Sequence, residues 1–156
     1  MKYLFFFLVF VTRCLSLDAY VLIMSADELV KSSELILTGT VVEKAVIGKK
    51  NGYDLAKNSI HVLKVLKGNL SAEKPFEFTT CTINVKEKNF EEDPPAELPE
   101  KNSQVLLFLR KDPEKNWTLT DPRQGIIRIK DGKVVNPRDP NMEMIEESVR
   151  KQGKQR

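Results

Sequence analysis

The sequence predicts a mainly β protein: a small, closed, OB-like antiparallel barrel with a short N-terminal helix and a C-terminal helix. Three observations predict it. Short β-branched runs separated by turn residues recur between residues 34 and 136. A helix-capping pattern precedes them, and an amphipathic helical pattern follows them. A strongly bent sheet of six or seven short strands favours closure, because closure removes exposed edge strands.

The N-terminal helix is predicted from about Ala26 to Ser33. Ser25 and Glu28 have the spacing of a capping box, in which each side chain satisfies a backbone N–H of the first turn. Met24 and Leu29 are placed to close over that box as a hydrophobic staple. These signals indicate where the helix begins.

The first hairpin is predicted to follow this helix directly. Residues 34–47 are rich in β-branched side chains and indicate a long strand, bent or bulged at Gly39. Asn51-Gly52 is a strong signal for a two-residue turn, so the chain should return antiparallel. The returning strand is predicted over residues 59–68 and ends at Gly68.

A third strand is predicted over residues 75–85. Phe76 and Phe78 alternate with polar residues at its start, and the alternation slips near Cys81. Such a slip predicts a β-bulge at that position. The charged, proline-interrupted stretch from 86 to 104 has no periodicity and predicts one exposed loop.

The second half of the sheet begins with VLLFL, residues 105–109, which has no polar alternation and predicts a strand covered on both sides. Three more strands are predicted at residues 116–120, 125–129 and 133–136. Asp131-Gly132 should join the last two strands in a tight hairpin.

The closing helix is predicted over residues 141–152, after Pro137 and Pro140 have stopped strand formation. Its glutamates oppose a place on a membrane surface. Packing on the barrel is therefore expected, through one apolar stripe: Met142, Ile145 and Val149. Residues 153–156 are predicted to be a frayed tail.

The first sixteen residues have the layout of a secretory signal peptide. Lys2 precedes an apolar run that is too short to cross a bilayer as a helix. Small side chains favour cleavage before Leu17, which leaves a single barrel domain at 17–152. We therefore expect an exported protein, periplasmic or extracellular, without a transmembrane span.

A lipid anchor at Cys14 is the alternative to cleavage before Leu17. Lipoprotein processing would make Cys14 the first mature residue, but it normally requires glycine, alanine or serine just before the cysteine, and Arg13 is there. The anchored form would be an envelope protein with the same barrel.

The charge balance gives no electrostatic reason to expect a nucleic acid or an acidic membrane as partner. The chain has 25 basic and 22 acidic residues, and loss of Lys2 and Arg13 with the leader leaves a net charge of +1. Its one histidine and two cysteines, one of them in the leader, offer too few nitrogen and sulfur ligands for a zinc site. No metal and no cofactor are predicted.

Cys81 and His61 are the only cysteine and histidine that remain after the leader. A thiol-dependent enzyme would need them within hydrogen-bond reach, and their places on consecutive predicted strands make that conceivable. A lone thiol in a strand is more often a small core or half-buried residue. Trp117 is the one aromatic side chain that we single out for a role in binding, although a core or barrel-end place is favoured.

Four phrases of the sequence are characteristic when taken together: SSELILTGTVV (32–42), HVLKVLKG (61–68), QVLLFLRKD (104–112) and LTDPRQGIIRIKDGKVV (119–135). They resemble exported bacterial domains similar to the netrin-like module of tissue inhibitors of metalloproteinases. The resemblance spans most of residues 25–150 and implies an OB-type barrel with a terminal helix.

One departure from that family limits what the resemblance implies about function. In the inhibitors, a cysteine at the mature N-terminus chelates zinc, and further cysteines pin that end to the barrel. Here Leu17 is the expected first residue, no Cys-x-Cys follows it, and Cys81 has no partner. No functional residue of the family is therefore carried over.

The function predicted from the sequence is an exported, non-enzymatic binding or interaction module. Its ligand would be a protein or another extracytoplasmic molecule. Exposed loops on a rigid barrel commonly carry function, which points first to residues 48–54 and 90–101.

Overall fold

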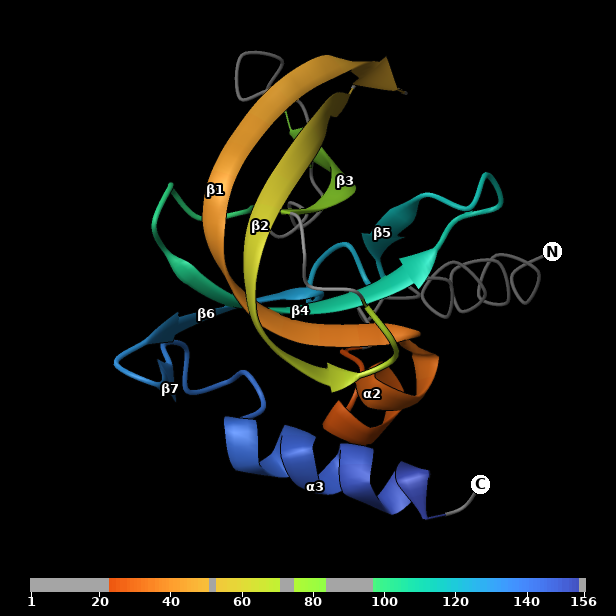
Figure 1. Cartoon of the computed structure of the whole chain (residues 1–156), viewed down its shortest axis with the longest axis vertical. Helices are drawn as coiled ribbons and strands as arrows, with labels where there is room; N and C mark the ends of the chain where they lie inside the picture. The colour runs from red at the N-terminus through yellow and green to blue at the C-terminus, as the bar shows by residue number, and fades with distance from the viewer. Residues whose placement is uncertain (1–22, 51–52, 71–74, 84–96, 155–156) are drawn as a thin grey trace, which may run out of the picture.

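The computed structural model describes residues 23–50, 53–70, 75–83 and 97–154 (Figure 1). The predicted leader, including Cys14, lies outside these ranges. The described elements, in chain order, are α2 (Ala26–Ser32), β1 (Leu35–Lys50), β2 (Tyr53–Lys67), β3 (Phe76–Ile83), β4 (Gln104–Lys111), β5 (Trp117–Leu119), β6 (Ile126–Lys130), β7 (Lys133–Val134) and α3 (Met142–Gly153).

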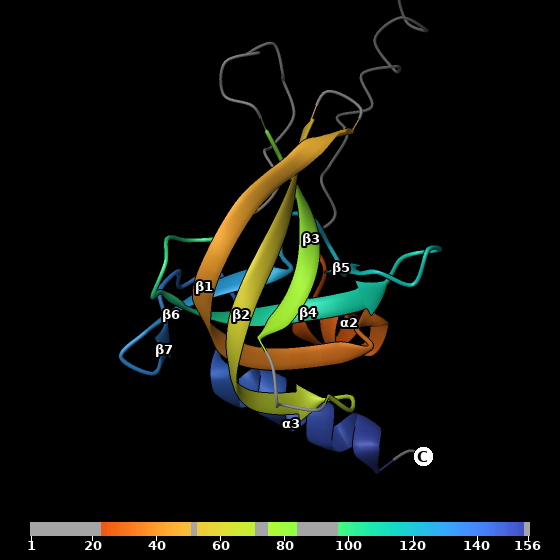
Figure 2. The same cartoon turned by 45° about the horizontal axis from the view of Figure 1, so that its top comes forward.

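Five of the strands close into a barrel (Figure 2). They are hydrogen-bonded in the order β1-β2-β3-β5-β4, and a β1–β4 pairing completes the ring, while β6 and β7 extend the sheet beyond β4. The prediction of a mainly β, OB-like barrel with two helices is confirmed. One detail differs, because β3 and β5 are parallel. A ring with an odd number of strands cannot alternate direction throughout, so one pair must be parallel.

β1 is long enough to pair along one edge with β2 and, through residues 35–40, along the other edge with β4. The β1–β2 register shifts between Thr38 and Gly39, which confirms the predicted bulge. The antiparallel return is also confirmed, although residues 51–52 themselves are outside the described ranges. β2 begins at Tyr53, earlier than predicted, because its polar first half is paired on both sides.

The predicted bulge at Cys81 is wrong. The β2–β3 register runs unbroken from Phe76 to Ile83. Thr80, a polar residue, takes the next buried position after Phe78, and its hydroxyl accepts a hydrogen bond of 3.0 Å from Nδ2 of the buried Asn58. Because Thr80 is polar although it points inward, the apolar alternation is interrupted in the sequence while the strand register is unchanged.

β4 separates two apolar clusters, so all five residues of VLLFL are buried as predicted. Val105, Leu107 and Leu109 face the barrel core. Leu106 and Phe108 face the opposite way, into a second cluster between the sheet and the two helices. The protein therefore has a barrel core and a helix-side core that share one strand.

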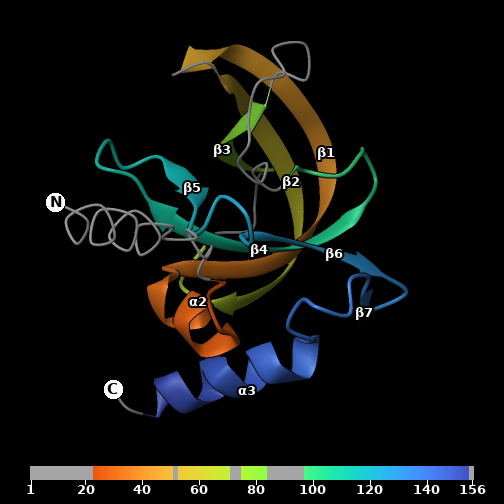
Figure 3. The same cartoon turned by 180° about the vertical axis from the view of Figure 1, so that it is seen from behind.

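The two helices lie side by side under the barrel (Figure 3). The predicted capping box is present, since Ser25 Oγ accepts from the Glu28 N–H while the Ser25 N–H donates to Glu28 Oε2. In α3, Ile145 is fully buried in the helix-side core, which confirms that this helix packs on the barrel. α3 extends to Gly153, one residue into the predicted tail.

Candidate functional site

The structure does not bring Cys81 and His61 together. Cys81 on β3 pairs with Leu55 of β2, whereas His61 lies six positions further along β2. At about 3.3 Å per residue, the two positions are about 20 Å apart. A nucleophile and its base must lie within hydrogen-bond reach, so these two side chains do not form a dyad.

The Cys81 side chain is exposed, which corrects the expectation of a core or half-buried thiol. Odd-numbered residues of this part of β3 face away from the barrel interior, because the buried positions are Phe76, Phe78 and Thr80. The outward direction follows from the unbroken register of β3.

Replacing Cys81 by serine should leave the free energy of unfolding within about 0.5 kcal/mol of the parent protein, because an exposed side chain contributes little packing. The folded parent should also react at once with a chromogenic disulfide reagent. Urea unfolding and thiol titration measure both effects. A thiol that reacts only after denaturation would contradict this placement.

Trp117 on β5 is half-buried at the edge of the barrel core. Its ring centroid lies 6.0 Å from that of Phe76, and Lys111 Nζ is 5.1 Å from the centre of the indole. The aromatic side chain thus packs on the core and carries a cation–π contact. These contacts show that Trp117 packs against the edge of the barrel core.

The segments that the sequence predicts as exposed loops are only partly loops in the structure. Most of residues 48–54 belong to β1 and β2, and residues 90–96 lie outside the described ranges. In the remainder, Leu98 and Pro99 are buried, and Leu98 belongs to the barrel core. The exposed-loop prediction is therefore wrong at these two positions, where an apolar pair covers the barrel.

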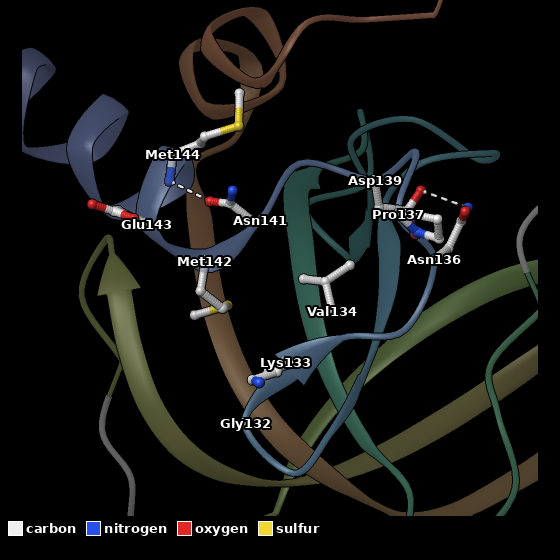
Figure 4. Close-up of a pocket in the computed structure, with 10 residues that line it drawn as sticks. All are labelled: Gly132, Lys133, Val134, Asn136, Pro137, Asp139, Asn141, Met142, Glu143 and Met144. Atoms are coloured by element: carbon white, nitrogen blue, oxygen red, sulfur yellow. Dashed lines mark hydrogen bonds between the residues drawn. The ribbon is translucent and has the colours of Figure 1, made fainter.

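Two hollows flank the connection between β7 and α3, residues 135–141, which we call the β7–α3 connection. The first, the hairpin hollow, has a volume of about 470 Å³ and lies between the β6–β7 hairpin and the start of α3 (Figure 4). Val134 and Met142 point into this space. The second, the arginine hollow, has a volume of about 300 Å³ and is lined by Glu97, Arg123, Ile126, Arg128, Val135, Asn136 and Asp139.

Local hydrogen bonds explain the shape of the β7–α3 connection. Asn136 Nδ2 donates to Asp139 Oδ1 at 3.2 Å, and the Arg138 N–H donates to Asn136 Oδ1 at 3.1 Å. Asn141 then caps α3 by accepting from the Met144 N–H at 2.9 Å. Asn136 and Asp139 line both hollows, so one fixed turn shapes the two sites.

The hairpin that precedes this connection turns as the sequence predicts. Asp131 and Gly132 have φ angles of 52° and 74°, the left-handed pair that a tight two-residue hairpin requires. The Val135 N–H then donates to the Arg128 carbonyl at 3.0 Å, which holds the start of the connection against β6.

At the arginine hollow, the acidic side chains have partners within the protein, whereas the arginines have no side-chain partner among the described residues. Glu97 is paired with Lys44 at 2.9 Å, and Asp139 accepts the hydrogen bond from Asn136. Partial burial of Asp139 raises the pKa of its carboxyl above the ordinary value of 3.8, and the Asn136 hydrogen bond opposes part of that rise. Neither Arg123 nor Arg128 forms an ion pair within the described part of the chain.

Replacing Asp139 by asparagine should raise the free energy of unfolding at pH 7, by less than about 1 kcal/mol because solvent screens a partly exposed carboxylate. A raised pKa in the folded state means that folding disfavours the ionised form, a cost present above that pKa and removed as the pH falls through it. The variant should therefore lose its advantage at pH 3. Urea unfolding at both pH values measures this, and a pH-independent difference would contradict it.

Sequence reasoning did not find either hollow. The sequence pattern assigns Asn136 to the last predicted strand, and Pro137 and Pro140 only to its end. The available signal was the Asn136-Pro137-Arg138-Asp139 run, in which an asparagine side chain can bond to the backbone two residues on. Such a signal indicates a shaped turn but does not show which distant segments meet it.

The fold and the hollows describe a small OB-like barrel protein with two surface concavities beside its terminal helix. Comparison of the sequence with models of protein families and with curated proteins found no match. Among the described residues, no helix has the length and apolar character needed to cross a membrane. Within the same residues, no group of three or more metal-ligating side chains is clustered.

Proposed function

We propose that this protein is an exported, non-enzymatic binding module whose ligand site is the β7–α3 connection with its two hollows. The observation that carries the proposal is the meeting of three distant segments, around residues 97, 123–128 and 135–139, at one concave surface. Concave surfaces that gather a few polar groups are where proteins usually bind ligands.

Export is the second part of the proposal and is supported by the leader pattern of the first sixteen residues. The chain would reach the periplasm or the cell exterior and meet a protein or another extracytoplasmic ligand there. Membership of the netrin-like group is proposed alongside it, on the sequence phrases and on the five-stranded barrel with its terminal helix.

Affinity co-purification of the protein after export tests the binding site. Val135 lines the arginine hollow and is 53 % exposed, whereas Val46 is 61 % exposed and lines neither hollow. A ligand retained by the parent and by Val46→Glu, but lost by Val135→Glu, would support the proposal. A set of bound molecules unchanged by Val135→Glu would contradict the site.

Mass spectrometry of the mature N-terminus decides between the two exported forms. A free Leu17 is expected if the leader is cleaved as proposed. An acylated Cys14 would instead establish the lipid-anchored alternative with the same barrel. Recovery of the uncleaved chain from inside the cell would contradict export in either form.

A further inference from the structure

The arginine hollow contains two guanidinium groups that are available to a ligand. Arg123 and Arg128 line it, both side chains are exposed, and neither is bonded to another side chain of the described residues. A guanidinium presents five N–H donors in a planar fork that matches the two oxygens of a carboxylate. Two such groups at one concavity make an anion its natural ligand.

The acidic side chains of the same hollow are already bonded within the protein. Lys44 donates to Glu97 at 2.9 Å, and Asn136 donates to Asp139 at 3.2 Å. These bonds direct the two carboxylates toward protein donors. The charged groups of the hollow without a partner among the described residues are thus the two arginines, so the expected ligand is negatively charged.

The backbone beneath both arginines is fixed. The Arg123 N–H donates to Asp121 Oδ1 at 2.8 Å in the turn before β6. Arg128 lies within β6, where its residue pairs with Val105 of β4, and its carbonyl accepts from the Val135 N–H. A site built on a turn and a strand held in this way needs little ordering on binding.

The charge at the hollow favours a singly charged ligand. Glu97 and Lys44 cancel, which leaves the two arginines opposed by Asp139, a net charge of +1. A dianion such as phosphate would leave the hollow with a net negative charge beside the Asp139 carboxylate, whereas a monocarboxylate would make the net charge zero. Like charges brought close in an interface are costly.

Apart from Asn136, the remaining lining is apolar and small. Ile126 is 8 % exposed and belongs to the barrel core, and Val135 is 53 % exposed beside it. Alternate residues of a strand share a face, so Ile126 and Arg128 lie on the same side of β6. A volume of about 300 Å³ is at the small end for ligand sites and suits one short group.

We infer that the arginine hollow binds a carboxylate attached to a short apolar group, as at the C-terminal residue of a peptide or in a small organic acid. Arg123 and Arg128 hold the carboxylate, and Ile126 with Val135 contacts the apolar group. The inference rests on the proposed function for the location of the ligand site, and it adds the chemical class of the ligand.

N-acetyl-leucine and N-acetyl-leucinamide are the matched probes, since they share the acetyl-leucyl group and differ in the terminal group, a carboxylate in the first and a neutral carboxamide in the second. Amide resonances of the exported protein should shift saturably with N-acetyl-leucine around residues 123–128 and 135–139. The neutral amide should bind at least about tenfold more weakly, because a hydrogen bond to a charged group is lost. Inorganic phosphate at the same concentration should not displace the carboxylate.

Arg128→Gln and Arg123→Gln should each weaken N-acetyl-leucine binding about tenfold, while Arg110→Gln should bind as the parent does. Arg110 is an exposed arginine on β4 that lines neither hollow. An unchanged unfolding temperature in all three variants shows that the fold is intact. Equal binding by the parent and both hollow variants, or equal binding of the neutral amide, would overturn the inference.

The two proposals fail in different experiments. A cellular ligand that depends on Val135, together with no binding of N-acetyl-leucine, would remove the carboxylate chemistry and keep the binding module. Carboxylate binding in solution, together with bound molecules unchanged by Val135→Glu, would keep the chemistry and remove the proposed function. A peptide amide that binds as tightly as the free peptide would exclude a chain terminus as the source.

Discussion

Replacing Gly39 by alanine should cost about 3 kcal/mol of folding free energy, as expected for overpacking a closed core. An added Cβ would lie 2.3 Å from Ile60 Cγ2 and 2.8 Å from the His61 carbonyl oxygen. Ile60 is fully buried, and the carbonyl belongs to the paired backbone of β2, so neither can give way cheaply. Urea unfolding followed by circular dichroism measures the loss.

Gly48 supplies the matched control on the same strand. A Cβ added there would meet no atom within 4 Å, so Gly48→Ala should unfold at nearly the parent urea concentration. Equal effects of the two substitutions would show that β1 and β2 do not approach closely at Gly39. The comparison isolates packing, because both glycines lie beside register shifts of β1.

Truncating Phe108 to alanine should cost about 4 kcal/mol, within the range for removing a large side chain from a packed interior. Phe108 is fully buried and lies in the helix-side core together with Leu29 of α2 and Ile145 of α3. The cavity would open between the sheet and both helices. Thermal and urea unfolding of the variant measure the loss.

Leu63→Ala is the control for Phe108→Ala. The Leu63 side chain is 52 % exposed, so its truncation should change the unfolding free energy by less than about 0.5 kcal/mol. A small loss for Phe108→Ala, comparable to that control, would mean that the helix layer does not cover β4. The predicted difference follows from VLLFL being buried on both faces.

The parts of the fold that could be predicted from sequence are those with local signals. Ser25 and Glu28 mark the start of α2 through their own hydrogen bonds, and Asp131-Gly132 forms the turn that its residue types require. VLLFL is apolar on both faces, so its burial follows from pattern alone. In each case, the residues that carry the signal also make the contact.

The predictions that failed depended on pairing with distant residues. Thr80 is buried because Asn58 of β2 offers it a hydrogen bond, a partner 22 positions away that no local pattern reveals. The polar start of β2 becomes a strand because β1 and β3 pair with it on either side. Leu98 was assigned to an exposed loop because its neighbours in sequence are charged.

The candidate site could not be predicted for the same reason. Glu97, the two arginines Arg123 and Arg128, and Asp139 come from three separate stretches of chain, and each alone is an ordinary charged residue. The pairing of β4 with β6, the Lys44–Glu97 ion pair and the hydrogen bonds of the β7–α3 connection bring them to one hollow. The set of charged groups at that hollow therefore results from how the strands pair, and no local sequence pattern predicts it.

The parallel contact between β3 and β5 is held by one residue pair, Thr79 with Thr118, while the other pairs in the ring join at least three. A hydrogen bond of 3.4 Å from the Thr79 hydroxyl to the Trp117 carbonyl adds little to this seam. The barrel is closed at its weakest point by the short β3–β5 pairing. Local opening of the barrel, measured by amide hydrogen exchange, should begin at the β3–β5 pairing. Separating β3 from β5 exposes the interior while the other strand pairs stay joined.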